Sequence, residues 1–170
     1  MFIGGGRIIH ASSTAGKVVE QNIYDTKNII TIRRFLQWGN DSSFVFDARF
    51  YSDKYDDLKR AFGYDSHALY KHYLDHGINE GRQGSILFDV SYYKNTYGDL
   101  KNAFGGNNKS YVDHFIQYGI NEGRRASNEF DPQFYKNNYG DLQNAFGNNM
   151  KSYYQHYIQY GRNEGRKTHN

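Results

Sequence analysis

The strongest constraint on the fold of this chain is a sequence pattern that returns every 42 residues without an insertion. Each copy opens with a Phe-Asp pair and closes with the four residues Asn-Glu-Gly-Arg. The opening pairs are Phe46-Asp47, Phe88-Asp89 and Phe130-Asp131. One copy alone would bury too little apolar surface to be stable, and such a period is typical of arrays whose neighbouring repeats stack into a continuous core. We therefore expect three stacked copies at residues 46–87, 88–129 and 130–170.

Local patterns predict two to three short helices in each copy, and thus a mainly α fold. Asp47 can cap a first helix through its carboxylate, and Pro132 suits the first helical position of the third copy. The apolar residues that follow are spaced four, three and four apart, so they line one helical face. In the first copy these residues are Tyr51, Tyr55, Leu58 and Phe62.

Glycines predict where these helices break. Gly98 and Gly140 come just before Asp99 and Asp141, which indicates a kink followed by a second short helix that the aspartate caps. A further helix is expected over residues 69–76 and at the equivalent places in the other copies, with a glycine ending it. The glycines expected to end it are Gly77, Gly119 and Gly161.

Aromatic residues supply much of the apolar surface. The chain has 17 Tyr and 12 Phe but a single Trp, with a mean hydropathy of −0.89, so tyrosine rings must carry a large part of the packing. The net charge is +3, with basic and acidic residues interleaved, and no apolar run approaches membrane-spanning length. We expect no nucleic acid, no membrane and no cofactor as partners.

Residues 1–38 do not follow the repeat and consist of short β-prone runs separated by Gly and Ser, which predicts strands. The stretch from Met1 to Ser12 resembles the late strands of NlpC-type, papain-like cell-wall peptidases, and Ile32 to Phe35 is similar to their closing strand. The resemblance implies that residues 1–38 are the truncated C-terminal end of such a domain, whose parent protein is a peptidoglycan cysteine endopeptidase. Residues 39–45 are then expected to be a flexible linker.

The same resemblance implies that His10 corresponds to the third member of a catalytic triad, the residue that orients the general-base histidine. Such a residue works only with a thiolate nucleophile and a base. The chain contains no cysteine, and the base histidine would fall immediately before Met1. We expect the chain alone to be inactive as a peptidase, with His10 a vestige.

The repeat pattern over residues 46–170 resembles the C-terminal repeats of secreted and cell-wall-lytic proteins, such as endolysins and autolysins, of Gram-positive bacteria and their phages. This resemblance implies an extracellular or cell-wall location and a bacterial cell-wall polymer, either peptidoglycan or wall polysaccharide, as partner. Residues 1–7 lack the layout of a signal peptide, so we expect export by another route. The alternative is an array that binds a protein partner, forms a homo-oligomer or associates with its full-length parent.

Candidate ligand-binding residues are tyrosines that the pattern allows to be exposed, since such a ring can stack on a sugar, and the arginines that close each copy. They are Tyr92, Tyr118, Tyr153, Tyr160, Arg82, Arg124 and Arg166. The competing interpretation places the aromatic rings in the core and makes each arginine part of a loop ion pair, as Arg82 with Glu80, joining one copy to the next.

One histidine recurs in each copy and raises the question of a metal site. These residues are His72, His114 and His156. One histidine per copy supplies too few ligands, so we expect a packed and hydrogen-bonded imidazole and no metal.

Overall fold

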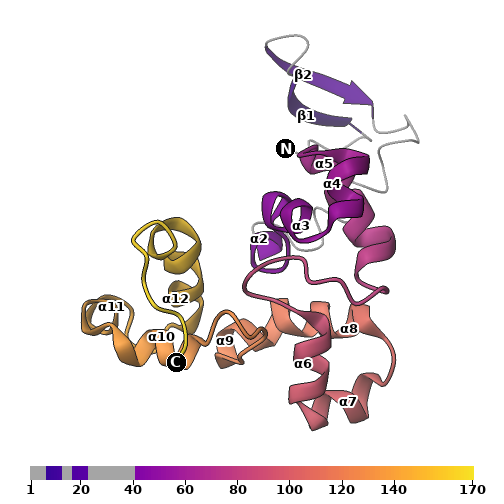
Figure 1. The fold of residues 1–170 in the computed structure, drawn as a ribbon. Helices are drawn as coiled ribbons and strands as arrows, with labels where there is room; N and C mark the ends of the chain where they lie inside the picture. The colour runs from indigo at the N-terminus through magenta and orange to yellow at the C-terminus, as the bar shows by residue number, and fades with distance from the viewer. Residues whose placement is uncertain (1–6, 13–16, 23–40) are drawn as a thin grey trace. The chain divides into compact units, whose positions relative to one another are not determined.

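The computed structural model describes residues 7–12, 17–22 and 41–170, and these are mainly helical (Figure 1). The chain divides into two units, residues 1–39 and 40–170. In the first unit, β1 (Arg7–Ser12) pairs with antiparallel β2 (Lys17–Asn22). The backbone of His10 lies opposite Val19 in this register. The expected strands around Ile29 and from Ile32 to Phe35 lie outside the described residues.

The second unit begins with a short helix, where a flexible linker was expected. Helix α2 (Ser42–Val45) buries Phe44 and Val45, which are 2% and 0% exposed. The linker prediction for residues 39–45 is therefore wrong at residues 42–45, because two apolar side chains there find a place in the core; residues 39 and 40 lie outside the described part of the chain.

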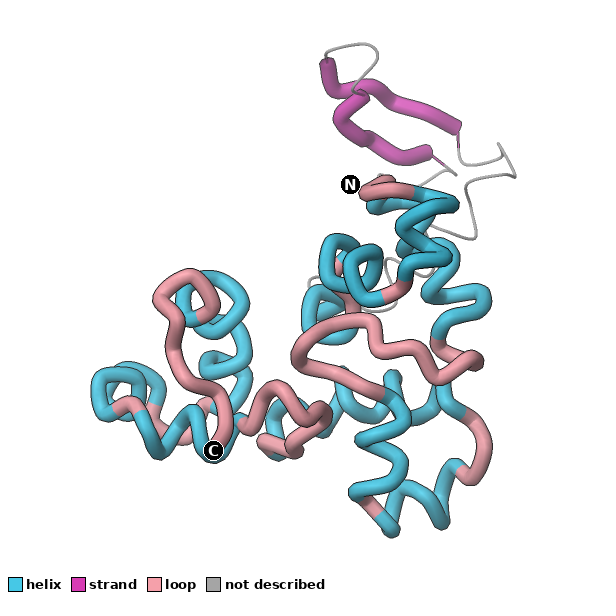
Figure 2. Tube along the Cα trace, viewed as in Figure 1, coloured by secondary structure: helices cyan, strands magenta, loops and turns pink. Residues whose placement is uncertain are grey.

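The same sequence of elements recurs at the 42-residue offset, in the order helix, helix, helix, π-helical turn. The first set is α3 (Ala48–Lys54), α4 (Asp56–Phe62), α5 (Ser66–His72) and η2 (Tyr73–Gly77). The second set is α6 (Val90–Thr96), α7 (Gly98–Phe104), α8 (Asn108–His114) and η3 (Phe115–Gly119), followed by α9 (Ile120–Glu122). The third set is α10 (Pro132–Asn138), α11 (Gly140–Phe146), α12 (Met150–His156) and η4 (Tyr157–Gly161). Loops at residues 82–89 and 124–131 lead into the second and third sets (Figure 2).

The aspartate that opens each copy caps the first helix, as the sequence predicted. The Asp47 carboxylate accepts a hydrogen bond from the backbone N–H of Phe50 at 3.0 Å, and Asp89 and Asp131 cap α6 and α10 in the same way. Pro132 occupies the first turn of α10, also as predicted.

The aspartate expected to cap the second helix does not do so. Tyr97 is the N-cap of α7 and makes no side-chain cap bond, while Asp99 lies within the first turn. The carboxylate of Asp99 instead pairs with the guanidinium of Arg124 at 2.9 Å. The cap prediction for Asp99 and Asp141 is wrong because α7 and α11 begin at the preceding glycine, which places each aspartate within the first turn and not at the N-cap.

The glycine expected to end the third helix has a different role. Gly119 closes the π-helical turn η3 with its backbone still helical, and the left-handed glycine comes four residues later, at Gly123 with φ of +66°. A Cβ on Gly119 would collide with the buried hydroxyl of Tyr93. Close approach of a tyrosine therefore requires glycine here, and the same holds for Gly77 against Tyr51 and Gly161 against Tyr135.

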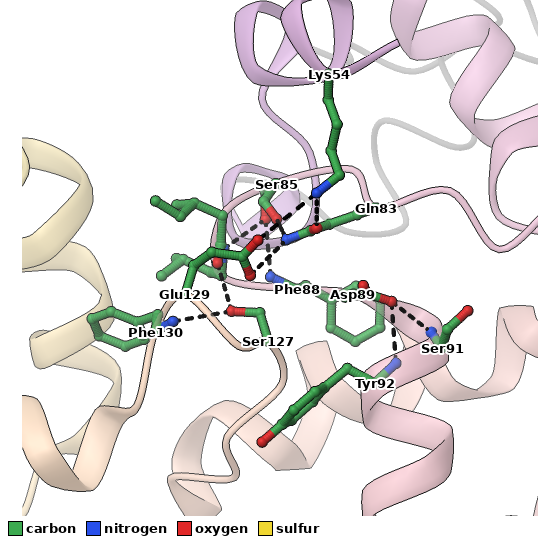
Figure 3. Close-up of polar contacts among 12 residues, drawn as sticks. Lys54, Gln83, Ser85, Phe88, Asp89, Ser91, Tyr92, Ser127, Glu129 and Phe130 are labelled. Atoms are coloured by element: carbon green, nitrogen blue, oxygen red, sulfur yellow. Dashed lines mark hydrogen bonds and ion pairs between the residues drawn. The ribbon is translucent and has the colours of Figure 1, made fainter. Parts of the chain in front are cut away.

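Backbone and serine hydrogen bonds close each copy and join it to the next. The N–H of Asp47 donates to the carbonyl of Gly84 at 2.9 Å, which ties the start of the first copy to its end. Ser85 Oγ then donates to the carbonyl of Phe44 at 2.7 Å, and Ser127 Oγ to that of Ile86 at 2.6 Å. Figure 3 shows Ser85 and Ser127 at this junction, close to Glu129.

The third copy also contacts the first part of the unit. Tyr154 is fully buried; its ring lies 6.2 Å from that of Phe44, and its hydroxyl donates to the carbonyl of Arg124 at 2.8 Å. Lys151 pairs with Asp41 at 2.8 Å, and a second ion pair, between Arg162 and Asp47, spans 3.1 Å. None of the helices in the described part of the chain is long and apolar enough to span a membrane.

Candidate functional site

A buried tyrosine holds the recurring histidine in each copy. Tyr93 lies on α6 and is 0% exposed, and its hydroxyl forms a hydrogen bond with His114 Nδ1 at 3.1 Å. The equivalent distances are 3.1 Å for Tyr51 and His72 and 3.0 Å for Tyr135 and His156. Each histidine is packed and hydrogen-bonded, as the sequence predicted, so its ring is fixed relative to the core.

Burial also sets the charge of these imidazoles. Desolvation lowers the pKa of His114 below its ordinary value of 6.5, and it does the same for His72 and His156. All three rings are therefore uncharged at neutral pH. Within the described ranges, no group of three or more His, Asp or Glu residues is arranged to hold a metal ion.

In each copy the recurring histidine is the middle member of a row of three rings. In the second copy Phe104 lies 5.9 Å from His114, and His114 lies 5.6 Å from Tyr118, between ring centroids. The third copy repeats these distances with Phe146, His156 and Tyr160. We call each row an aromatic ladder. The three ladders are Phe62-His72-His76, Phe104-His114-Tyr118 and Phe146-His156-Tyr160.

The outer rings of the second and third ladders are among the most exposed large apolar side chains in the described part of the chain. Tyr118 is 56% exposed and Tyr160 is 57% exposed, on the π-helical turns η3 and η4. The structure thus places these two predicted site residues at equivalent surface positions. In the first copy the equivalent ring is His76, which is also exposed.

Tyr153 and Tyr92 do not share that exposure. Tyr153 is 0% exposed and donates its hydroxyl to the carbonyl of Gly147, so its expected exposure is wrong: its ring packs edge-on against Phe146 in the core. Tyr92 is half-buried, and the guanidinium of Arg125 lies over its ring at 5.7 Å. These two tyrosines offer far less free ring surface than Tyr118 and Tyr160.

The closing arginines each form a compact cluster within their own copy. Arg124 pairs with Asp99 at 2.9 Å and with Glu122 at 2.5 Å, while its guanidinium stacks over the ring of Tyr97 at 4.7 Å. Arg82 and Arg166 form the same cluster with the equivalent residues. The loop ion pair considered from the sequence is therefore present, but it lies inside one copy and does not join two.

The sequence did not reveal the inner rings of the ladders as surface residues. The apolar helical face that contains Phe62 predicts a core position for its counterpart Phe104, but Phe104 is partly exposed beside His114. A signal was available: the spacing of four residues between His114 and Tyr118, and between His156 and Tyr160, places each pair on one helical face.

The ladders have a geometry suited to a flat ligand. A buried tyrosine holds the central histidine of each ladder, and in the second and third copies an exposed tyrosine ring packs against that histidine. A ring that is already packed loses less conformational entropy when a ligand stacks on it. Comparison of the chain with protein-family models, with curated proteins and with solved structures finds no match.

Proposed function

We propose that residues 46–170 form a binding module for a polymer of the bacterial cell wall, and that the aromatic ladders are its contact sites. One observation carries the proposal: a tyrosine more than half exposed stands at the same place in the second and third copies, backed by a fixed, uncharged histidine.

Stacking on an exposed ring suits a carbohydrate ligand. The ring of Tyr118 offers an apolar face that can cover the C–H face of a sugar, and its hydroxyl can exchange hydrogen bonds with neighbouring groups. Each contact of this kind is weak. A polymer that presents the same unit many times can engage Tyr118 and Tyr160 together, and avidity then lengthens the residence of the module.

Retention on purified Gram-positive cell walls tests the proposal. We expect Tyr118→Ala and Tyr160→Ala each to weaken retention, and the double variant to lower apparent affinity by about tenfold or more, since hot-spot aromatics contribute more than about 1 kcal/mol. Circular dichroism checks that the helices remain folded.

Tyr64→Ala is a matched control. The side chain of Tyr64 is 55% exposed, within two percentage points of the exposed fractions of Tyr118 and Tyr160. It belongs to no ladder, and its hydroxyl bonds to Asp53. It should leave retention unchanged. A folded double ladder variant that binds walls as well as the parent would overturn the assignment of these tyrosines. Failure of the parent chain to bind walls, together with concentration-dependent self-association in sedimentation, would favour the protein-interaction alternative.

A further inference from the structure

We infer that the ladders recognise the uncharged glycan of the wall rather than its phosphate-bearing polymers. This inference rests on the proposed function and names the ligand class of the same sites. The geometry that points to it is the position of the arginine cluster, defined in the second copy by Arg124, Asp99 and Glu122, beside the ladder.

Two ring contacts connect that cluster to the ladder. Tyr93 bonds to the ladder histidine His114 and lies 5.0 Å from the ring of Tyr97. The guanidinium of Arg124 in turn stacks over the ring of Tyr97 at 4.7 Å. The carboxylates of Asp99 and Glu122 are close enough to influence the charge of His114.

The cluster is negatively charged and offers no free cation. It combines one guanidinium with two carboxylates, so its formal charge is −1 in each copy. The pKa of Asp99 lies below its ordinary value because Arg124 donates hydrogen bonds to it, so the carboxylate is ionised at neutral pH. A phosphate approaching Arg124 would have to displace these partners and would meet their negative field.

The lysines on the two helices that carry the ladder histidines His114 and His156 are also paired. Lys109 on α8 lies 3.1 Å from Asp113, and on α12 Lys151 pairs with Asp41. Arg162, which follows η4, pairs with Asp47 at 3.1 Å. Because burial lowers the pKa of His114 and His156, these two rings do not add a cation at neutral pH.

The same carboxylates suit sugar hydroxyls. The side chains of Asp99 and Glu122 remain 59% and 44% exposed while they bind Arg124, so each has oxygen surface that can accept a hydrogen bond. A sugar ring stacked on Tyr118 presents hydroxyl donors at its edge. Ring face and acceptors together describe a site for an uncharged glycan.

Two probe polymers separate the ligand classes. Purified walls are divided into a fraction treated with cold hydrofluoric acid, which cleaves phosphodiesters and leaves the glycan, and an untreated fraction; poly(glycerol phosphate) serves as the isolated polyanion. We expect the full chain to bind treated walls at least as tightly as untreated walls and not to bind poly(glycerol phosphate). Raising the salt from about 0.05 M to about 0.5 M should change retention by less than about twofold, because little charge attraction is present to screen.

The outcomes distinguish the inference from the proposed function. Binding to untreated walls with loss on treated walls, or capture by poly(glycerol phosphate) that high salt abolishes, would overturn the inference and leave wall binding intact. Absence of binding to either wall fraction would overturn both. Binding to treated walls that the Tyr118→Ala and Tyr160→Ala double variant loses would support both.

Discussion

The first copy and the two later copies share one core but present different surfaces. In all three, a buried tyrosine lies against a glycine and bonds to a histidine, and the three hydrogen-bond distances agree within 0.1 Å. The outer ladder ring is His76 in the first copy, whereas it is Tyr118 and Tyr160 in the others. Packing therefore fixes the tyrosine, histidine and glycine of the core, while the exposed ring can change without altering the fold.

The largest expected effect concerns the shared core. Tyr51→Ala and Tyr93→Ala should each lower the free energy of unfolding by roughly 3–5 kcal/mol, the range for truncation of large buried aromatic side chains. The two losses should be similar, because both rings are 0% exposed and bond to equivalent histidines. Urea denaturation measures them. A difference of several kcal/mol between the two variants would show that the copies do not share one core design.

A smaller loss is expected from a single added methyl group. Gly119→Ala should cost about 1–3 kcal/mol, because its Cβ collides with the Tyr93 hydroxyl and overpacks the core. Gly98→Ala is the matched control: no atom lies within 4 Å of its added Cβ, and its φ is not positive. That variant should be neutral or more stable by about 0.4–1 kcal/mol. Equal destabilisation of the two variants in urea would contradict the steric explanation.

Protonation of the recurring histidine in each copy should make stability depend on pH. Their pKa values are lower in the folded chain than the ordinary 6.5, so below that pH the unfolded chain binds more protons. The contribution of these histidines to the free energy of unfolding is fully present above pH 6.5. It is lost as the pH falls from 6.5 toward their folded pKa values. Urea midpoints at about pH 7.5 and about pH 5.5 measure the loss. His114→Gln should make the slope shallower, and an unchanged slope would point to other groups.

A second decrease in stability is expected at lower pH, where the aspartates paired with the closing arginines become protonated. Asp57, Asp99 and Asp141 have pKa values held below their ordinary 3.8 by hydrogen bonds from the closing arginines. Their contribution is present above pH 3.8 and disappears as the pH falls below it. The two pH windows are separate, so one titration of stability can distinguish the histidine core from the arginine clusters.

The smallest effect tests the difference between the copies directly. His76→Tyr gives the first ladder the outer ring of the other two, and we expect a gain in wall retention of about two- to fivefold through a third weak contact. His67→Tyr is the control, because it adds the same ring to an exposed position of α5 that belongs to no ladder. If both variants bind equally, added aromatic surface alone would explain the gain.

Local chemistry in the sequence predicted much of the fold. The mainly α class is confirmed, and the caps at Asp47, Asp89 and Asp131 follow from a side chain and the backbone within three residues of it. The packed state of the histidines was also predicted. The caps depend on neighbours in sequence, and the helical class depends on a periodicity that is visible in one copy.

Features that depend on residues far apart in the chain could not be predicted from the sequence. Asp99 pairs with Arg124, which lies 25 residues later, and Gly119 is required by a tyrosine on another helix. Tyr153 and Tyr160 are both tyrosines of the same helical stretch, yet one is 0% and the other 57% exposed. Tyr160 lies within the π-helical turn η4, which shifts the helical phase after Tyr153, and no residue pattern in the sequence signalled that turn.

The contacts of the third copy with the start of the unit have a consequence for folding. The ion pair between Arg162 and Asp47 spans 115 residues, and Tyr154 packs against Phe44 across 110. Such high contact order slows folding and couples distant segments, whereas an open solenoid can unfold one repeat at a time. We expect the array to melt in one cooperative transition. Deleting one copy would then disturb the two that remain, so single side-chain replacements give the cleaner measure of each ladder.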